Sequence, residues 1–302
     1  MKPESTIVHE ETFHEIICAI AKQAAVNLSE DALKMLQRAR DRESFSAARG
    51  VLEAMLTNAE IAKENETSLC QSPGYPVVYL SLGRGFVLNG FDPHQVAGHA
   101  ISDVTRRGYL RPSIVHPLSR ENTKDNSGAN VPDVEITVAP EEELLEVVIS
   151  FKGCGAELFS RAAVLPPHRI GPSASGIKRF VLETVAGAGG GPCPPVVLGV
   201  GIGGQLHQAA KLARRAMGIR RWDDVNPDPE LAELEAELAQ GVNGLGLGPA
   251  GIGGDTTCLG VKIGMAYTHT AIVPIVVNFH CWPARRARAR MGHSGKVTYH
   301  GW

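Results

Sequence analysis

Residues Gly187–Gly204 read GAGGGPCPPVVLGVGIGG and place one cysteine, Cys193, between two glycine clusters. The apolar run Val196–Val200 is short and rich in β-branched residues, which predicts a buried strand. The glycines permit turns and close backbone approach, while the flanking prolines fix the backbone and remove amide donors. The stretch therefore predicts a rigid loop leading into a buried strand. Its thiol is either placed for chemistry or a small residue of the core.

The composition limits the classes of partner. The chain has 302 residues, is 43% hydrophobic and carries a formal net charge of -2. Apart from the run Arg285–Arg290, this charge provides no general attraction to nucleic acids or acidic membranes. No apolar run approaches the roughly 20 residues of a membrane span, and the polar, acidic N-terminal segment is not a signal peptide. We therefore expect a cytoplasmic protein that binds neither nucleic acid nor membrane.

Helical and strand patterns alternate along the chain on both sides of the central stretch. Residues 10–63 repeat apolar side chains at helical spacing, and further helices are expected around His94 and His99, over Ala174–Ala186, after Val200, and from Pro229 to Gly241. Expected strands are Val77–Leu82, Val134–Val138, Leu144–Phe151, Val196–Val200, Cys258–Ile263 and Ile275–Phe279. The predicted fold class is α/β (α+β), a mixed sheet packed with helices. Residues 1–66 are expected to form an N-terminal helical layer of a single domain whose remainder is 67–302.

Two local expectations follow from neighbouring patterns. The strands Val134–Val138 and Leu144–Phe151 flank the acidic turn APEEE, which predicts that they pair with each other. The arginine run Arg285–Arg290 is expected to form a basic helix, and the last ten residues a polar tail or an edge strand.

The six cysteines differ in their sequence context. In a cytoplasmic protein they should be mostly reduced, so metal or catalytic roles outrank disulfides. Cys70, Cys193 and Cys281 each lie in a loop flanked by glycine or proline beside an expected buried strand. The other three (Cys18, Cys154 and Cys258) do not fully share that context. Three thiolates brought together suit a soft metal ion or an iron–sulfur cluster.

Two further segments are candidates for binding anions. Gly153–Gly155 follows a strand and precedes a helix, a geometry in which backbone amides point outward toward a phosphate or carboxylate. A long polar segment holds Arg111, Arg120 and Lys124, which either bind carboxylates or are solvated loop charges.

A dinucleotide-binding interpretation also fits part of the pattern. Gly199, Gly201 and Gly204 spell GxGxxG between a strand and a helix, and Asp223 and Asp224 follow about 20 residues on. These acids lie in a proline-rich linker and not at a strand end, and GGGPCPP has no place in that fingerprint. A nucleotide-binding oxidoreductase stays an alternative.

Five motifs occur in the order seen in class I fumarases: CQSPG at Cys70, KGCG at Lys152, GGPCPPVVLGVGIGG at Gly190, GLGPAGIGGDTT at Gly244 and HTAIVPIVVNFHCWPARR at His269. Over nearly its whole length the chain resembles the α subunit, or N-terminal domain, of the fumarate hydratase and L(+)-tartrate dehydratase family. The resemblance implies a [4Fe–4S] cluster held by Cys70, Cys193 and Cys281, with one iron open to substrate. Cys154 matches no ligand position.

The same resemblance implies contacts to substrate. It assigns Gln71, Gly153 and Gly155 to a substrate carboxylate and His269 to its other end, and it places Ser72 where the family has a residue that touches the substrate. Arg111, from the polar loop, is a further candidate for binding the substrate. The alternative for His269 is a hydrogen-bonded core histidine. Ser72 departs from the family, which usually has CQDTG with an aspartate at this position. The loop Asn122–Pro132 is longer than in fumarases and more similar to that of tartrate dehydratases.

The implied activity is a hydro-lyase that reversibly adds or removes water on a small hydroxy-dicarboxylic acid of the fumarate/malate type. The alternatives are an L-tartrate dehydratase or related subunit, and a cluster-binding paralogue with altered catalysis. The catalytic base is unknown and is expected in a β subunit, within a heterodimer or heterotetramer. The isolated chain should bind the cluster yet turn over little substrate.

Overall fold

A computed structural model describes residues 5–300 of the chain, which form two compact units. Unit 1 combines the residues up to Glu30, Asn58–Lys152 and the residues from Pro283 onward, whereas unit 2 combines Asp31–Thr57 and Gly153–Trp282. The expected N-terminal helices form as α1 (Glu10–Val26), α2 (Glu30–Arg42) and α3 (Ser46–Glu64). These helices contribute to both units. The division of the chain into a helical layer of residues 1–66 and a remainder of residues 67–302 stays a prediction.

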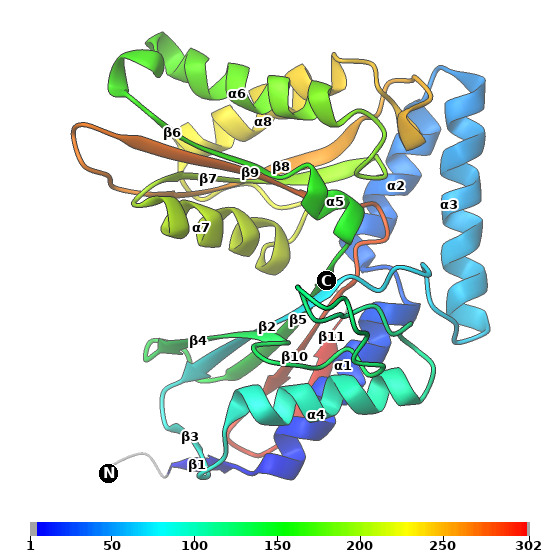
Figure 1. Ribbon diagram of the computed structural model, residues 1–302, viewed down its shortest axis with the longest axis vertical. Helices are drawn as coiled ribbons and strands as arrows, with labels where there is room; N and C mark the ends of the chain where they lie inside the picture. Colours follow the sequence, from blue (N-terminus) through cyan, green and yellow to red (C-terminus); the bar gives the residue numbers. More distant parts are fainter. Residues whose placement is uncertain (1–4, 301–302) are drawn as a thin grey trace. The chain divides into compact units, whose positions relative to one another are not determined.

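Unit 1 is built on a five-stranded sheet in the order β11-β10-β5-β2-β4 (Figure 1). Its strands are β2 (Tyr75–Gly83), β4 (Asp133–Ala139), β5 (Leu145–Lys152), β10 (Arg286–Met291) and β11 (Val297–His300). Strands β2 and β4 run parallel, whereas β5 is antiparallel to β2 and β10. Helices α1 and α4 (Pro93–Arg106) share one apolar core with this sheet, and a short parallel pair, β1 (Thr6–Val8) and β3 (Phe86–Leu88), completes the unit.

Two sequence expectations about unit 1 are wrong. Strands β4 and β5 do not pair with each other, because β2 lies between them and pairs with both. The arginine run is not a helix but strand β10, which pairs with β5 and β11. Its alanines, Ala287 and Ala289, are fully buried in the core, so the alternation of arginine and alanine has the period of a strand. The expected edge strand near the end of the chain is confirmed as β11.

Unit 2 is built on a four-stranded sheet in the order β6-β9-β7-β8. Its strands are β6 (Arg161–Leu165), β7 (Val196–Gly203), β8 (Cys258–Ala266) and β9 (Val273–His280). Helices α6 (Ser175–Ala188) and α8 (Pro229–Asn243) cover one face and α7 (Leu206–Ile219) the other (Figure 1). Short helices complete the unit: α5 (Cys154–Leu158), η1 (Pro167–Arg169), η2 (Pro172–Ala174) and η3 (Pro249–Gly251). The expected α/β class with mixed sheets is thereby confirmed.

The GxGxxG pattern serves helix packing. Gly199 and Gly201 lie inside β7, where a Cβ atom would come within 2.1 Å of the Ala213 carbonyl oxygen or 1.8 Å of the Ala209 carbonyl oxygen, both on α7. Only glycine therefore lets α7 lie this close to the strand. A dinucleotide fingerprint would instead place its first glycines in the turn after the strand.

The acids that complete the dinucleotide pattern are engaged in ion pairs. Asp223 accepts from Arg221 at 2.8 Å, which lowers the pKa of the Asp223 carboxyl group. Asp224 pairs with Arg220 and with Lys262, each at 2.7 Å. These contacts argue against a ribose-binding role for either acid.

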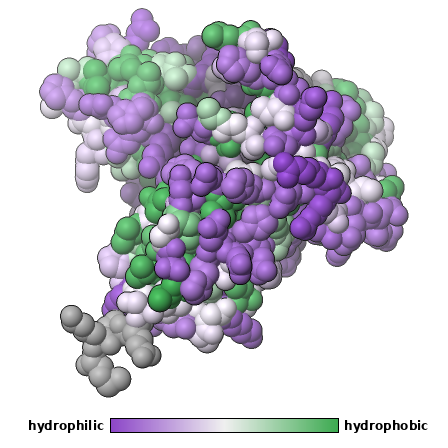
Figure 2. Space-filling view, turned by 60° about the horizontal axis from the view of Figure 1, so that its bottom comes forward, coloured by the Kyte–Doolittle hydropathy of each residue, from purple (hydrophilic) through white to green (hydrophobic). Residues whose placement is uncertain are grey.

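Hydrophilic residues cover most of the face drawn in Figure 2, and hydrophobic residues gather there in smaller groups. None of the helices between residues 5 and 300 is long and apolar enough to cross a membrane.

Candidate active site loops

Cys193 lies at the turn of a tight loop directly before β7. Its φ angle is +59°, its amide donates to the Gly190 carbonyl oxygen at 3.1 Å, and its side chain is exposed. The buried prolines Pro192 and Pro194 flank it. A left-handed backbone is uncommon outside glycine, so the loop holds this thiol in a conformation that surrounding contacts must enforce.

A second glycine-rich loop supplies those contacts. The Ala250 amide donates to the Pro194 carbonyl oxygen at 2.8 Å. Gly251 has a φ of +76°, and a Cβ atom there would lie 2.5 Å from the Cα atom of Gly190. The two loops therefore touch backbone to backbone, which explains why both are rich in glycine.

The buried carboxylate of Glu43 anchors this second loop. Glu43 accepts from the Asp255 amide at 2.9 Å and from the Thr256 amide at 3.3 Å. In return, Asp255 accepts from the Ser44 amide at 2.8 Å, and the hydrogen bonds with Ser44 lower the pKa of Asp255. Sequence reasoning missed Glu43 because its partners lie more than 200 residues away along the chain and no local motif marks it.

Cys281 directly follows β9 and is buried. The amide of the next residue, Trp282, donates to the Cys193 carbonyl oxygen at 3.5 Å, so the loops of Cys193 and Cys281 are neighbours within unit 2. The preceding residue, His280, is fully buried, and its ring packs edge-on against Trp222 with centroids 5.1 Å apart. Two of the three predicted ligand loops are thus joined by a backbone hydrogen bond.

Cys70 belongs to unit 1 and lies just before β2, half-buried. Its sulfur accepts the Ser72 amide at 3.4 Å. The Ser72 carbonyl oxygen accepts from the guanidinium of Arg285, a residue that is 2% exposed. Arg285 is a second residue that sequence reasoning missed. The run of arginines is a signal for this residue, but by charge alone it predicts a basic helix.

The remaining cysteines have other surroundings. Burial raises the pKa of the Cys258 thiol to about 12 and also raises that of Cys18, which lies in the core of unit 1 beside the ring of His14. A buried apolar site disfavours the thiolate that a metal requires. Cys154 is exposed at the start of α5.

The predicted substrate contacts divide between the two units. Gln71, Ser72 and Arg111 belong to unit 1, whereas Gly153, Gly155 and His269 belong to unit 2. Gln71 and Arg111 are exposed, and Ser72 is half-buried. His269 is exposed and its Nδ1 atom accepts the Ala271 amide at 3.2 Å, so the alternative of a core histidine is wrong.

The buried residue Asn126 holds the long polar loop that carries Arg111. Its side-chain amide donates to the Arg111 carbonyl oxygen at 3.0 Å, and its oxygen accepts the Ser113 amide at 2.7 Å. The backbone on either side of Pro112 is therefore fixed, while the guanidinium of Arg111 faces solvent.

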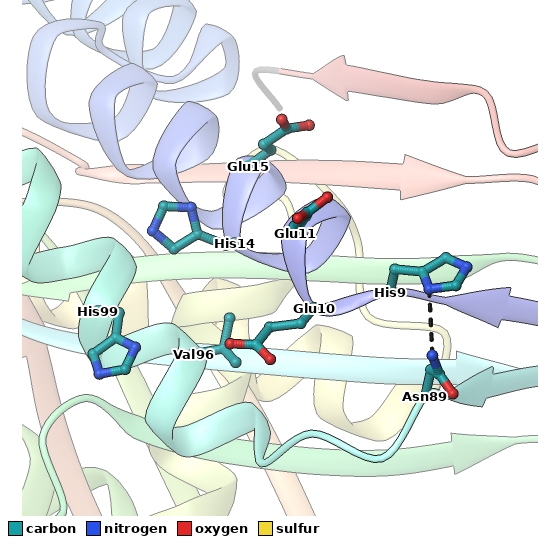
Figure 3. Close-up of a pocket in the computed structure, with 8 residues that line it drawn as sticks. All are labelled: His9, Glu10, Glu11, His14, Glu15, Asn89, Val96 and His99. Atoms are coloured by element: carbon teal, nitrogen blue, oxygen red, sulfur yellow. Dashed lines mark hydrogen bonds between the residues drawn. The ribbon is translucent and has the colours of Figure 1, made fainter.

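Unit 1 also contains an open cavity of about 720 Å³ that involves none of the predicted ligand loops. Histidines and glutamates of α1 and α4 line much of it, and Figure 3 shows His9 turned toward Asn89, 3.3 Å away, while Glu11 and Glu15 point elsewhere. Its side chains do not converge, and residues 5–300 contain no group of three or more His, Cys, Asp or Glu side chains placed to hold a metal ion.

Comparison with known proteins links these loops to one enzyme family. The family model described as "Fumarate hydratase (Fumerase)" matches residues 14–290. The chain is 38% identical over 288 residues to the "Putative L(+)-tartrate dehydratase subunit alpha" of Methanocaldococcus jannaschii, covering 94% of this chain and 99% of that protein. It is 30% identical to proteins named "L(+)-tartrate dehydratase subunit alpha" from two Escherichia coli strains. These are UTI89 (277 residues, 92% of this chain and 90% of that protein) and K12 (272 residues, 90% and 88%).

Proposed function

Since the chain belongs to the fumarate hydratase family of hydro-lyases, we propose that it is the α subunit of an iron–sulfur enzyme for a small hydroxy-dicarboxylic acid. The curated relatives are named as tartrate dehydratase subunits, and the long loop Asn122–Pro132 points the same way. L-tartrate is therefore the first substrate to test. The fumarate/malate pair is the second.

The donor chemistry of the loops fits a [4Fe–4S] cluster held by Cys70, Cys193 and Cys281. The observation that carries this proposal is the hydrogen bond from Trp282 to Cys193, which joins two of the three ligand loops. Cys70 supports it by accepting an amide hydrogen bond on its sulfur, a contact that suits a thiolate. Cys18 and Cys258 lie in apolar cores, where burial raises the pKa of each thiol and disfavours the thiolate, which argues against them as ligands.

When bound, a cluster with one open iron supplies a Lewis acid for the substrate hydroxyl group. The side chains of this chain would then orient the dicarboxylate. In this proposal Arg111 and the side chain of Gln71 bind carboxylate oxygens, the amides of Gly153 and Gly155 bind the same end, and His269 hydrogen-bonds the other. Ser72 places a neutral hydroxyl where relatives of the CQDTG type have a carboxylate, so it does not serve as a proton acceptor at neutral pH.

A β subunit is the proposed partner, and it would carry the catalytic base. The names of the curated relatives contain the words subunit alpha, which supports assembly with a second kind of chain. We propose a heterodimer or heterotetramer, located in the cytoplasm.

Anaerobic reconstitution tests the cluster. The chain should bind about four irons and four sulfides. Cys281→Ser should remove most of the bound iron, while Cys258→Ser is the matched control and should leave it in place. Equal iron content in the two variants would refute the assignment of ligands.

Co-expression with a β chain tests the activity. The complex should dehydrate L-tartrate faster than malate, while the α chain alone should turn over little. A cluster-loaded complex that is inactive on both acids would favour the paralogue with altered catalysis. A protein that binds no iron but binds a nicotinamide would revive the dinucleotide alternative.

A further inference from the structure

Arg285 places a buried positive charge beside the loop that carries Cys70. The residue is 2% exposed, and its guanidinium donates to the Ser72 carbonyl oxygen. A buried charge is costly unless it is paired or hydrogen-bonded. The contact to Ser72 is therefore a strong local constraint, and removal of one partner should make the position of the other less fixed.

The sheet of unit 1 fixes the base of the Arg285 side chain. Arg285 immediately precedes β10, and its carbonyl oxygen accepts the Phe151 amide at 2.9 Å at the end of β5. Strand β5 lies between β10 and β2, and Ser72 lies just before β2. The guanidinium consequently reaches past the end of β5 to the loop before the next strand but one.

The loop offers few other ways to be held at this point. Ser72 is followed by Pro73, whose nitrogen carries no hydrogen, so the carbonyl oxygen is the only hydrogen-bonding group of the peptide between them. The Ser72 amide, on the other side of the residue, donates to the Cys70 sulfur at 3.4 Å. The backbone of Ser72 is thus held on both sides, at its carbonyl oxygen by Arg285 and at its amide by Cys70.

We propose that Arg285 is a positioning residue that fixes Ser72, so that the Ser72 amide stays directed at the sulfur of Cys70 and Gln71 stays oriented between them. This inference rests on the proposed function for its catalytic meaning. Hydrogen bonds to cluster sulfurs help to set the reduction potential, so a loosened Ser72 would change the cluster as well as the loop. Arginine suits the role because its planar fork stays charged and rigid.

Hydrogen–deuterium exchange on the full-length chain without cluster tests the structural part. Arg285→Met should raise the exchange rates of the Gln71 and Ser72 amides about tenfold or more, because a charged hydrogen bond to the loop is lost. Arg285→Lys should give a smaller increase, since it restores a charge and a donor. The matched control is Arg288→Met on β10, which removes an ion pair with Glu146 on the neighbouring strand β5 and should leave the loop unchanged.

The outcomes separate this inference from the proposed function. Unchanged exchange at Gln71 and Ser72 in Arg285→Met overturns the inference, even if a cluster forms. Failure of the wild-type chain to bind iron overturns the proposed function, while the exchange result still decides the role of Arg285. If Arg285→Met increases exchange throughout unit 1, Arg285→Lys decides: an increase confined to residues 68–75 supports the inference, whereas an increase throughout unit 1, or none at residues 68–75, refutes it.

A spectroscopic measurement tests the link to the cluster. After reconstitution, Arg285→Lys should alter the electron paramagnetic resonance signal of the reduced cluster and shorten its lifetime in air several-fold. Arg288→Met should match the wild type in both. Identical spectra and lifetimes for wild type and Arg285→Lys would show that the loop contact does not reach the cluster.

Discussion

At the scale of single residues, Cys258 and Cys281 show that burial alone does not define the role of a thiol. Both are buried, but Cys258 lies in the apolar core of unit 2, where desolvation raises its pKa to about 12. Cys281 instead lies in the loop beside Cys193. The surroundings of the two thiols therefore differ, and Cys258 can serve as a buried control for substitutions of Cys281.

The Cys258 thiol should make the protein less stable at alkaline pH. The pKa of this thiol in the folded protein is about 12, above its ordinary value of 9.0, so the unfolded chain loses this proton first. The contribution of the protonated Cys258 thiol to the free energy of unfolding is therefore fully present below about pH 9. It falls as the pH rises toward 12, by up to about 1.4 kcal/mol per pH unit. Urea unfolding at pH 8, 9 and 10 under reducing conditions measures this slope.

The matched variant is Cys258→Ala. It should be less stable than the wild type at pH 8, because a buried side chain becomes smaller, but its stability should fall less steeply above pH 9. Parallel slopes for the two proteins would show that Cys258 ionises normally in the folded state.

The cysteine loops could be predicted from sequence because glycine and proline mark their turns locally. Glu43 and Arg285 could not be predicted, because what defines them is a partner 212 or 213 residues away. A buried charge has no local signature in composition or periodicity. Only the fold shows which distant backbone group each of these side chains serves.

At the scale of elements, the contact between β7 and α7 depends on glycine. Gly201→Ala would place its Cβ atom 1.8 Å from a backbone oxygen of the helix, so helix and strand would have to move apart. Overpacking of this kind should lower the free energy of unfolding by about 3 kcal/mol or more. Chemical denaturation of the purified chain measures the loss.

Gly50→Ala is the control for this prediction. Gly50 lies inside α3, and its added Cβ atom would meet nothing within 4 Å. Alanine should therefore raise stability by about 0.5–1 kcal/mol through helix propensity. Similar effects of the two substitutions would contradict the packing role of Gly201.

The two errors of the sequence analysis about unit 1 have different causes. The run Arg286–Met291 alternates charged and apolar residues, but the charges dominated the interpretation and the period of two was overlooked. The pairing of β4 with β2 instead of β5 has no local signal, since a sequence-adjacent strand is the usual partner. The sequence thus predicts the strands β2, β4, β5, β7, β8 and β9, but neither β6 nor β10, nor the strand order.

At the scale of the whole molecule, each unit is assembled from separated segments of the chain. Unit 1 needs β10 and β11 from the residues after Trp282 to complete a sheet that begins with β2. A chain ending at Trp282 should therefore fail to unfold cooperatively and should aggregate, because β5 would become an exposed edge and its core would lose Ala287, Ala289 and Met291. Calorimetry and light scattering measure both effects.

A chain ending at Gly292 is the appropriate comparison. It keeps β10 and loses β11, an edge strand whose residues are partly exposed, together with His293, whose ring stacks on Phe86. This shorter truncation should still unfold cooperatively, with a midpoint at a lower temperature than that of the full-length chain. Cooperative unfolding of the chain that ends at Trp282 would contradict the dependence of unit 1 on β10.

The late position of β10 has a consequence for synthesis on the ribosome. Strand β5 emerges long before its neighbour β10, and all of Gly153–Trp282 is translated in the interval. The nascent chain must therefore carry an unfinished sheet edge while unit 2 is still being made. A chaperone that shields Leu145–Lys152 during this interval should therefore raise the soluble yield of the protein.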